Sequence, residues 1–160
     1  HLVPDELPVT RAIFTEPLAA ALEILTQVHI SPDKNAAVLG DGRLALLTAQ
    51  VLALTGVDLT VIGRHPEKLE LFRPFARVTT CGEKEGYEIV AECTGSETGL
   101  PQAMELVRKK GTILLKSTYS GKLRLLNDNK IHLPEIELYE LKDFEKAFAS
   151  KAFKSGFSFV

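Results

Sequence analysis

The chain alternates between short, almost wholly apolar runs and longer segments in which hydrophobic residues recur at helical spacing. Apolar runs bounded by turn residues are typical of buried strands, and longer periodic segments are typical of helices. Strands are therefore predicted at 35–40, 57–63, 76–81, 87–95 and 112–118. Helices are predicted between them, at 43–56, 65–74 and 99–111.

A further helix is predicted before the first strand. It follows Pro17, a residue suited to a first helical turn, and its hydrophobic positions are Leu18, Ala21, Leu22, Leu25 and Val28. Near the C-terminus, a helix is predicted at 141–153 and a last strand at 156–160.

Strands that alternate with helices in this way are typical of a doubly wound α/β fold, in which a mostly parallel sheet has helices on both faces. We expect a single Rossmann-like domain over residues 1–160, with five to six strands. A ligand should lie across the carboxyl ends of the first and fourth strands, where the strand order reverses.

Composition and charge narrow the classes of protein to consider. The 160 residues are 45% hydrophobic and 25% charged, and the net charge of −2 does not build the basic face of a nucleic-acid-binding protein. The apolar run "LALLTAQVLAL" is interrupted by Thr48 and Gln50, so no membrane association is expected. The triplet "RKK" at 108–110 is placed at a helix C-terminus, where cations complement the helix dipole.

The two cysteines, Cys81 and Cys93, do not have the spacing of a metal site. No targeting peptide is recognisable, so a reducing, cytoplasmic location is expected. Cys81 is expected to be a buried structural thiol. The histidines are scattered along the sequence and are expected at surface or cap positions rather than as metal ligands: His1, His29, His65 and His132.

The most informative motif is the glycine turn after the first strand, G-x-G-x-x-A, formed by Gly40, Asp41, Gly42, Arg43, Leu44 and Ala45. In dinucleotide-binding folds the first glycine permits a tight turn and the second lets a pyrophosphate approach the backbone. The N–H groups that open the helix then bind phosphate oxygens. Two alternatives are a turn of the kind that binds S-adenosylmethionine and a glycine corner that serves only packing.

The end of the second strand bears on the choice of coenzyme. NAD-binding folds usually place an acidic residue there for the ribose hydroxyls, but this chain has Gly63, followed by Arg64 and His65. A guanidinium is a suitable partner for a 2′-phosphate, so NADP(H) is the preferred coenzyme and NAD(H) remains possible. Alternatively, Arg64 only points into solvent. His65 either adds charge to the phosphate site or only begins the next helix.

Five motifs occur together in one order: "FTEPLAAAL" (14–22), "VLGDGRLALL" (38–47), "VIGRHPEKL" (61–69), "ECTGS" (92–96) and "GTILLKST" (111–118). Together they resemble the coenzyme-binding half of a zinc-type alcohol dehydrogenase of the medium-chain dehydrogenase/reductase superfamily. The branch that acts on polyols, sugars and threonine is the most similar. The resemblance covers residues 1–120 well, and it displaces the S-adenosylmethionine alternative.

The resemblance implies which residues hold the coenzyme. The turn at Gly40, Asp41, Gly42, Arg43 and Leu44 would hold the pyrophosphate, and Gly63, Arg64 and His65 would border the adenosine ribose. Cys93, Thr94 and Gly95 would line the cleft, and Ser117 and Thr118 would lie near the nicotinamide. No catalytic residue is expected within this chain.

The family resemblance also implies a second domain, a GroES-like catalytic domain that binds zinc through Cys, His and Glu side chains and is expected before His1. The glutamate of the "EPL" motif, Glu16, would reach that zinc only if the catalytic domain is present. Within this chain Glu16 is more simply a helix first-turn carboxylate. The zinc dependence is likewise expected only together with that domain.

The family normally has a further strand and helix after the strand at 112–118. Here 119–160 looks like a shortened C-terminal portion, so a dimer through that sheet edge is in doubt, although a homo-oligomer is possible. The sequence thus predicts the coenzyme-binding domain of an alcohol, polyol or sugar dehydrogenase. The alternative is a dinucleotide-binding module, a sensor or a scaffold, without dehydrogenase activity.

Overall fold

The computed structural model describes residues 3–117, 137–140 and 155–158. The chain forms two compact units, His1–Ser117 and Thr118–Val160, which are considered separately. The helix predicted at 141–153 and the site residue Thr118 lie outside the described residues.

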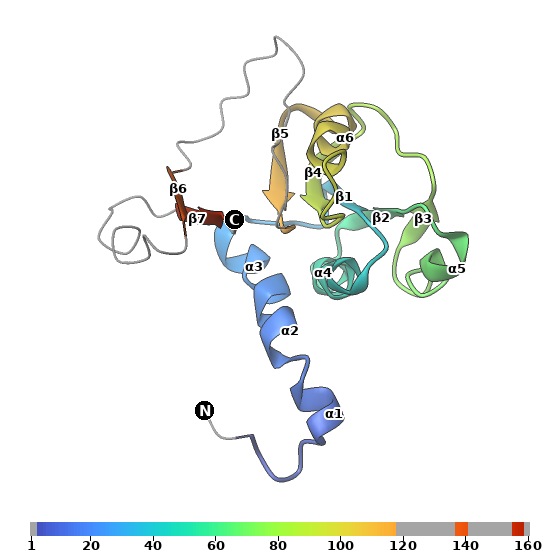
Figure 1. The fold of residues 1–160 in the computed structure, drawn as a ribbon. Coiled ribbons are helices and arrows are strands. Elements are labelled where there is room, and N and C mark those ends of the chain that lie inside the picture. Colours follow the sequence, from blue (N-terminus) through green and yellow to red (C-terminus); the bar gives the residue numbers. More distant parts are fainter. Residues whose placement is uncertain (1–2, 118–136, 141–154, 159–160) are drawn as a thin grey trace. The chain divides into compact units, whose positions relative to one another are not determined.

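The first unit contains the helices and strands that alternate along the sequence (Figure 1). In chain order they are α1 (Val9–Ala12), α2 (Thr15–Leu22), α3 (Ile24–Gln27), β1 (Asn35–Leu39), α4 (Arg43–Ala53), β2 (Asp58–Ile62), α5 (Pro66–Leu69), β3 (Arg77–Thr79), β4 (Tyr87–Glu92), α6 (Gly99–Leu106) and β5 (Val107–Leu115).

The five strands form one sheet in the order β3-β2-β1-β4-β5, and all the neighbouring strands are parallel. The central strand is β1, in which Val38 lies opposite Val61 of β2 on one side and Ala91 of β4 on the other. From β1 the chain moves outward through β2 to β3, and then crosses to β4 and β5 on the other side. The predicted doubly wound topology is confirmed, and the strand order reverses between β1 and β4.

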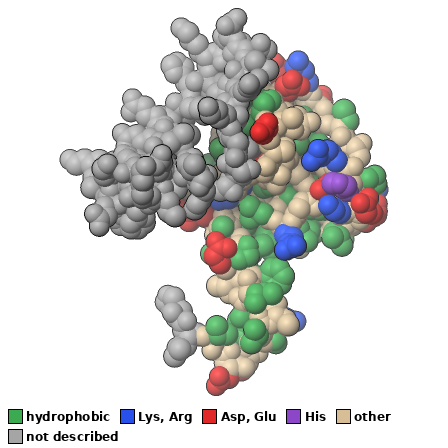
Figure 2. Space-filling view, viewed as in Figure 1, with side chains coloured by type: hydrophobic (Ala, Val, Ile, Leu, Met, Phe, Trp, Pro, Cys, Tyr) green, Lys and Arg blue, Asp and Glu red, His purple; other side chains and the backbone are tan. Residues whose placement is uncertain are grey.

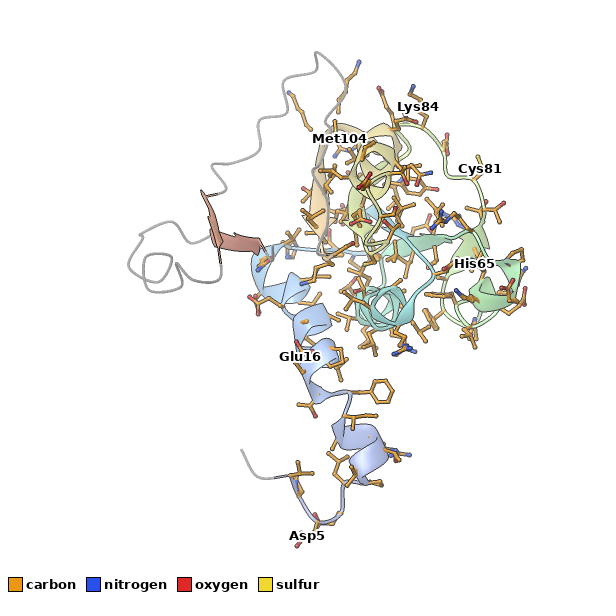
Figure 3. All side chains as sticks on the ribbon, in the orientation of Figure 1. Asp5, Glu16, His65, Cys81, Lys84 and Met104 are labelled. Atoms are coloured by element: carbon orange, nitrogen blue, oxygen red, sulfur yellow. The ribbon has the colours of Figure 1, made fainter. Side chains whose placement is uncertain are left out.

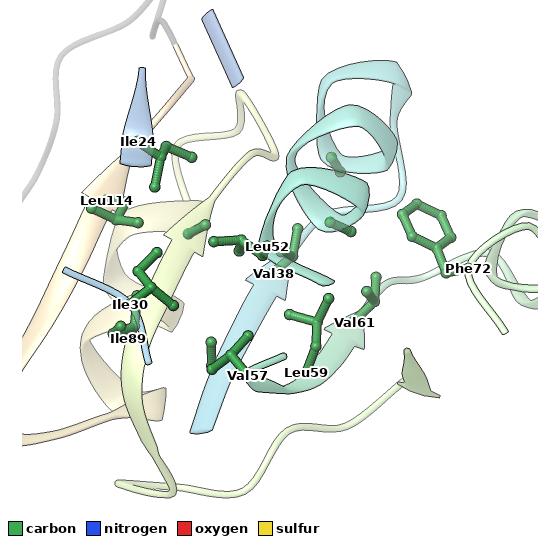
Figure 4. Packing of buried hydrophobic residues seen from close by; sticks show 14 of the residues in the cluster. Ile24, Ile30, Val38, Leu52, Val57, Leu59, Val61, Phe72, Ile89 and Leu114 are labelled. Atoms are coloured by element: carbon green, nitrogen blue, oxygen red, sulfur yellow. The ribbon is translucent and has the colours of Figure 1, made fainter. Parts of the chain in front are cut away.

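Hydrophobic side chains alternate between the two faces of the sheet and build a core on each. Ala36 and Val38 of β1 point to one face, where α4 packs through Ala45, Ala49 and Leu52 (Figure 4). The neighbouring residues Ala37 and Leu39 point to the other face, where α6 packs through Ala103 and Leu106. Strands buried on both faces explain the almost unbroken apolar runs of the sequence.

The first predicted helix is confirmed, but as the two helices α2 and α3. Of its five predicted apolar positions, only Ala21 and, in part, Val28 are buried. Ala21 and Ile24 are fully buried, whereas Leu18, Leu22 and Leu25 are exposed. Figure 2 shows hydrophobic side chains exposed along these N-terminal helices. Ile24 belongs to the same core cluster as Ala49 and Leu52 of α4, and α2 lies against α4.

Two of the predicted helices are too long. α5 ends at Leu69 rather than near Pro74, because the turns that follow direct Phe72 and Phe75 into the core. α6 ends at Leu106 rather than Gly111, so "RKK" at 108–110 lies on β5 and not at a helix C-terminus. Pairing with β4 stabilises this strand: Val107 lies opposite Tyr87, and the Arg108 guanidinium is 2.6 Å from a carboxylate oxygen of Glu88.

In the second unit the structure describes two short strands, β6 (Glu137–Glu140) and β7 (Ser155–Ser158), which pair in parallel. The strand predicted at 156–160 is confirmed in part by β7. Among the described residues, no helix is both long enough and apolar enough to cross a bilayer.

Candidate functional site

The carboxyl ends of β2, β1 and β4 lie level with one another at one edge of the sheet. The Gly40 N–H donates to the Ile62 carbonyl oxygen at 2.8 Å, and the Cys93 N–H donates to the Leu39 carbonyl oxygen at 2.8 Å. These bonds continue the parallel ladder one residue beyond the strands. The predicted site segments at 40–44, 63–65 and 93–95 therefore follow neighbouring strands at the same edge, where ligands of doubly wound sheets bind.

Gly40 provides the close approach between the ends of β1 and β4. Its φ is +126°, a conformation that side chains disfavour, and a Cβ placed there would lie 3.0 Å from the Cys93 carbonyl carbon. The first glycine of the turn is thus required by the protein's own backbone.

Gly42 is different, because nothing in the described structure lies within 4 Å of the position that its Cβ would occupy. It is the N-cap residue of α4, its φ of −86° is open to any residue, and no side chain caps the helix there. As in any α-helix, the first N–H groups of α4 have no intrahelical acceptors. This arrangement favours a phosphate-binding turn over a packing corner at Gly42.

Asp41, between the two glycines, bonds to the turn that follows β2. One carboxylate oxygen, Oδ2, accepts hydrogen bonds from the backbone N–H of Arg64 at 2.8 Å and of His65 at 2.9 Å. The same oxygen lies 2.9 Å from Nδ1 of the His65 ring. Gly63 makes room for this contact, since a Cβ on Gly63 would lie 2.7 Å from Cβ of Asp41. The two predicted segments are therefore tied together by a side chain.

These contacts alter the acidity of Asp41. Partial burial by itself raises the pKa of the Asp41 carboxyl group, but the hydrogen bonds from the backbone and ring of His65 and from the Arg64 N–H outweigh it. The pKa is therefore lowered from its ordinary value, and Asp41 is a carboxylate at neutral pH.

The side chains of Arg64 and His65 differ in their surroundings. The Arg64 side chain is exposed and makes no ion pair with any residue that the structure describes. His65 is the N-cap residue of α5, as one of the two sequence interpretations had it, and its ring also bonds to Asp41. In Figure 3 His65 lies at the start of α5, and Figure 2 shows basic and acidic side chains gathered around a histidine.

A buried carboxyl group that the sequence analysis missed lies at the end of β4. Glu92 is fully buried, and it accepts hydrogen bonds from the Thr94 N–H at 2.7 Å, from the Thr94 hydroxyl and from the Ser117 hydroxyl. Gly99, at the start of α6, leaves space for it, because a Cβ there would collide with Glu92 and Thr94. A glutamate directly after the apolar run Ile89–Ala91 was the signal that could have revealed it.

Glu92 thus connects two predicted site residues, Thr94 and Ser117. Thr94 and Gly95 belong to the loop after β4, and Ser117 follows β5, where it also donates to the Glu92 carbonyl oxygen at 3.2 Å. The loop is held further by the Ser96 N–H, which donates to the Thr94 hydroxyl at 3.1 Å. The structure therefore joins Thr94, which follows β4, to Ser117, which follows β5, through Glu92.

The two cysteines differ in exposure, and the prediction for Cys81 is wrong. Cys81 is exposed in the turn after β3, where its N–H donates to the Thr79 hydroxyl at 3.1 Å. β3 is a short strand at the edge of the sheet, and the thiol in the turn that follows it is exposed to solvent. Burial of the Cys93 thiol raises its pKa to about 12, and the nearby Glu92 adds to the effect.

This difference predicts selective labelling. At pH 8 a thiol reagent such as iodoacetamide should modify Cys81 rapidly and leave Cys93 unmodified, because only about one Cys93 thiol in ten thousand is ionised at a pKa four units higher. Mass spectrometry of the labelled protein, with Cys81→Ser as the control, measures this. Rapid modification of Cys93 in the folded control would contradict the burial of its thiol.

Zinc was expected only together with another domain, and the described residues do not by themselves form a zinc site. No three Cys, His, Asp or Glu side chains among them are close enough to hold a metal ion. Glu16 is exposed in the first turn of α2 (Figure 3).

Curated proteins with related sequences are reductases and dehydrogenases of sugars and polyols. The chain is 33% identical over 134 residues to ribulose-5-phosphate reductase of Streptococcus pneumoniae, a match that covers 76% of this chain and 38% of that protein. It is 31% identical over 171 residues to glucose 1-dehydrogenase of Thermoproteus tenax, a match that covers 92% of this chain and 49% of that protein. A zinc-type alcohol dehydrogenase-like protein of Escherichia coli is 26% identical over 136 residues. This chain belongs to the zinc-type alcohol and polyol dehydrogenases.

Solved structures agree with this assignment at the level of the fold. A zinc-binding dehydrogenase of Sinorhizobium meliloti bound to NADP superposes with a TM-score of 0.67 at 22% identity, covering 77% of this chain and 42% of that one. Acetophenone reductase of Geotrichum candidum in complex with NAD has a TM-score of 0.69 at 16% identity, and the match covers 99% of this chain and 58% of that one. No protein-family model matches the sequence.

The chain spans less than half the length of the curated dehydrogenases named above. With the solved dehydrogenases it shares the fold. In this chain the glycine turn lies at the point where the strand order reverses.

Proposed function

We propose that this chain is the nicotinamide coenzyme-binding domain of a zinc-dependent alcohol, polyol or sugar dehydrogenase, and that it prefers NADP(H) while accepting NAD(H). The observation that supports this best is the open space at Gly42, the N-cap residue of α4, where no side chain caps the helix. The pyrophosphate would bind there. The coenzyme supplies the hydride chemistry when bound, and the residues of this chain bind it and orient it.

The other site residues extend from this turn in both directions. On one side Gly63, Arg64 and His65 would border the adenosine ribose. On the other side Cys93, Thr94 and Gly95 would line the cleft toward the nicotinamide, with Ser117 and Thr118 beyond them. Glu92 would keep this second wall in place by joining Thr94 to Ser117.

The catalytic chemistry would require a second, GroES-like domain that supplies zinc ligands, with Glu16 as a possible addition from this chain. Exposed hydrophobic side chains between α1 and α2, Ile13 and Phe14, are of the kind that another domain covers. We also propose that residues 1–160 form one domain with a shortened C-terminal portion, and that the protein is cytoplasmic and can self-associate.

The preference for NADP(H) is proposed on the basis of Arg64, whose guanidinium is exposed and has no described partner. Replacing Arg64 with alanine should weaken NADPH binding about tenfold and leave NADH binding within about twofold, because only the 2′-phosphate needs the cation. Fluorescence titration of the full-length protein with each coenzyme, at low and high salt, measures both constants.

Arg77→Ala provides the matched control. It removes the same charge from the opposite edge of the sheet, where Arg77 pairs with Asp58 at 2.7 Å. A preference for NADH in the unmodified protein would contradict the role given to Arg64. Failure of both coenzymes to bind would contradict the proposed function itself.

A further inference from the structure

The place of the missing acidic residue at the end of β2 is filled in space by another part of the chain. A Cβ on Gly63 would lie 2.8 Å from Oδ2 of Asp41. The carboxylate of the glycine turn therefore occupies the volume in which a side chain at position 63 would begin. The sequence lacks an acid at this point, but the folded protein has one.

The hydrogen bonds of Asp41 leave one of its oxygens available. All three contacts from Arg64 and His65 are made to Oδ2, and no described residue donates to Oδ1. Among the described residues, no fully buried side-chain oxygen or nitrogen lacks a partner, so Oδ1 is at least partly exposed. The Asp41 side chain as a whole is only 11% exposed, and its geometry is held by three bonds.

We propose that Asp41 is a coenzyme-selectivity residue, which supplies from the glycine turn the ribose-binding carboxylate that β2 lacks. Oδ1 would accept a hydrogen bond from the adenosine ribose of NAD(H), and the negative charge would oppose the 2′-phosphate of NADP(H). This inference rests on the proposed coenzyme binding. It makes Asp41 and Arg64 opposing determinants, and it accounts for a site that accepts both coenzymes.

The lowered pKa of Asp41 is consistent with this role, because the carboxyl group stays charged over the pH range in which the coenzymes are bound. An uncharged residue at position 41 can keep the contacts that Asp41 makes with Arg64 and His65. The amide oxygen of an asparagine can accept the same N–H groups of Arg64 and His65, so Asp41→Asn removes the charge and retains the turn.

The test compares Asp41→Asn with the unmodified full-length protein in titrations with NADPH and NADH. The ratio of the two dissociation constants should shift about tenfold in favour of NADPH, mainly through tighter NADPH binding. Asp58→Asn is the matched control, because it removes one exposed carboxylate at the opposite end of β2. Its ratio should stay within about twofold of the unmodified protein. Thermal unfolding of both variants shows that they fold.

Three results would overturn the proposal: an unchanged ratio in Asp41→Asn, a shift toward NADH, or an equal shift in Asp58→Asn, which would indicate a long-range charge effect. If Asp41→Asn does not fold, Asp41→Ser takes its place, since the hydroxyl also accepts an N–H. Failure of the proposed function is distinguished from these, because the unmodified protein would then bind neither coenzyme, and both proposals would fall together.

Discussion

Replacing Gly42 with valine should abolish coenzyme binding and leave the fold intact. The structure has open space at the Gly42 Cβ position, and the backbone there has a φ of −86°. The Cβ of a valine would therefore meet nothing in the described structure, and the side chain would fill the volume where the pyrophosphate approaches the helix. We expect at least about a hundredfold loss of affinity for NADPH and NADH alike.

The loss of binding should be separate from a loss of stability. As an N-cap residue, valine is less favourable than glycine, so the free energy of unfolding should fall by no more than about 1 kcal/mol. Coenzyme titration and urea unfolding of the same preparation measure both quantities. Unchanged affinity in Gly42→Val would contradict the phosphate-binding role of the turn.

Gly40→Ala is the informative contrast, because it lies in the same turn and has the opposite environment. Its Cβ would lie 3.0 Å from the Cys93 carbonyl carbon, and its φ of +126° is unfavourable for alanine. This variant should lose stability and binding together. Stability equal to that of the unmodified protein would show that the ends of β1 and β4 can move apart.

Replacing Glu92 with alanine should destabilise the domain by about 3 kcal/mol. The substitution leaves a cavity where a fully buried side chain was, and it removes the acceptor of the Thr94 N–H and of the Thr94 and Ser117 hydroxyls. Each buried donor left without a partner costs about 1–3 kcal/mol, although the hydroxyls can rotate toward other acceptors. The midpoint of urea unfolding at constant slope measures the change.

Glu92→Gln is the matched control, because it keeps the volume and one acceptor oxygen. The free energy of unfolding should fall by about 1 kcal/mol, because the amide nitrogen of glutamine replaces the oxygen that accepts from the Ser117 hydroxyl. An alanine variant as stable as the glutamine variant would show that the network contributes little. A large loss in both would instead indicate that the second carboxyl oxygen is essential.

Much of the central fold could be predicted because it follows from local pattern. Val38 and its neighbours form an apolar run that is typical of a strand buried on both faces, and all five predicted strands are present in the sheet. The predictions failed at the ends of elements. Arg108 was predicted at a helix C-terminus, where a cation complements the helix dipole. In the structure it lies on β5, which pairs with β4.

The candidate site was predictable to the extent that it is continuous in sequence. The glycine turn at Gly40 and Gly42 and the segment at Arg64 were recognised from motif and spacing, and the structure places them at one edge of the sheet. The partners of Asp41 and the environment of Glu92 were missed. The Asp41 contacts join residues 23 and 24 positions apart, and Glu92 reaches a hydroxyl 25 positions away.

By itself, the sequence determined the alternation of strands and helices, the glycine turn between β1 and α4, and the absence of an acidic residue at position 63. These features depend on residues close in sequence, whose side-chain size and polarity decide local conformation. Only the tertiary structure decided which carboxylate lies beside that position and which glycine faces open space. These groups meet because paired strands that are distant in sequence end side by side. That pairing depends on contacts between distant segments, which a local sequence pattern does not contain.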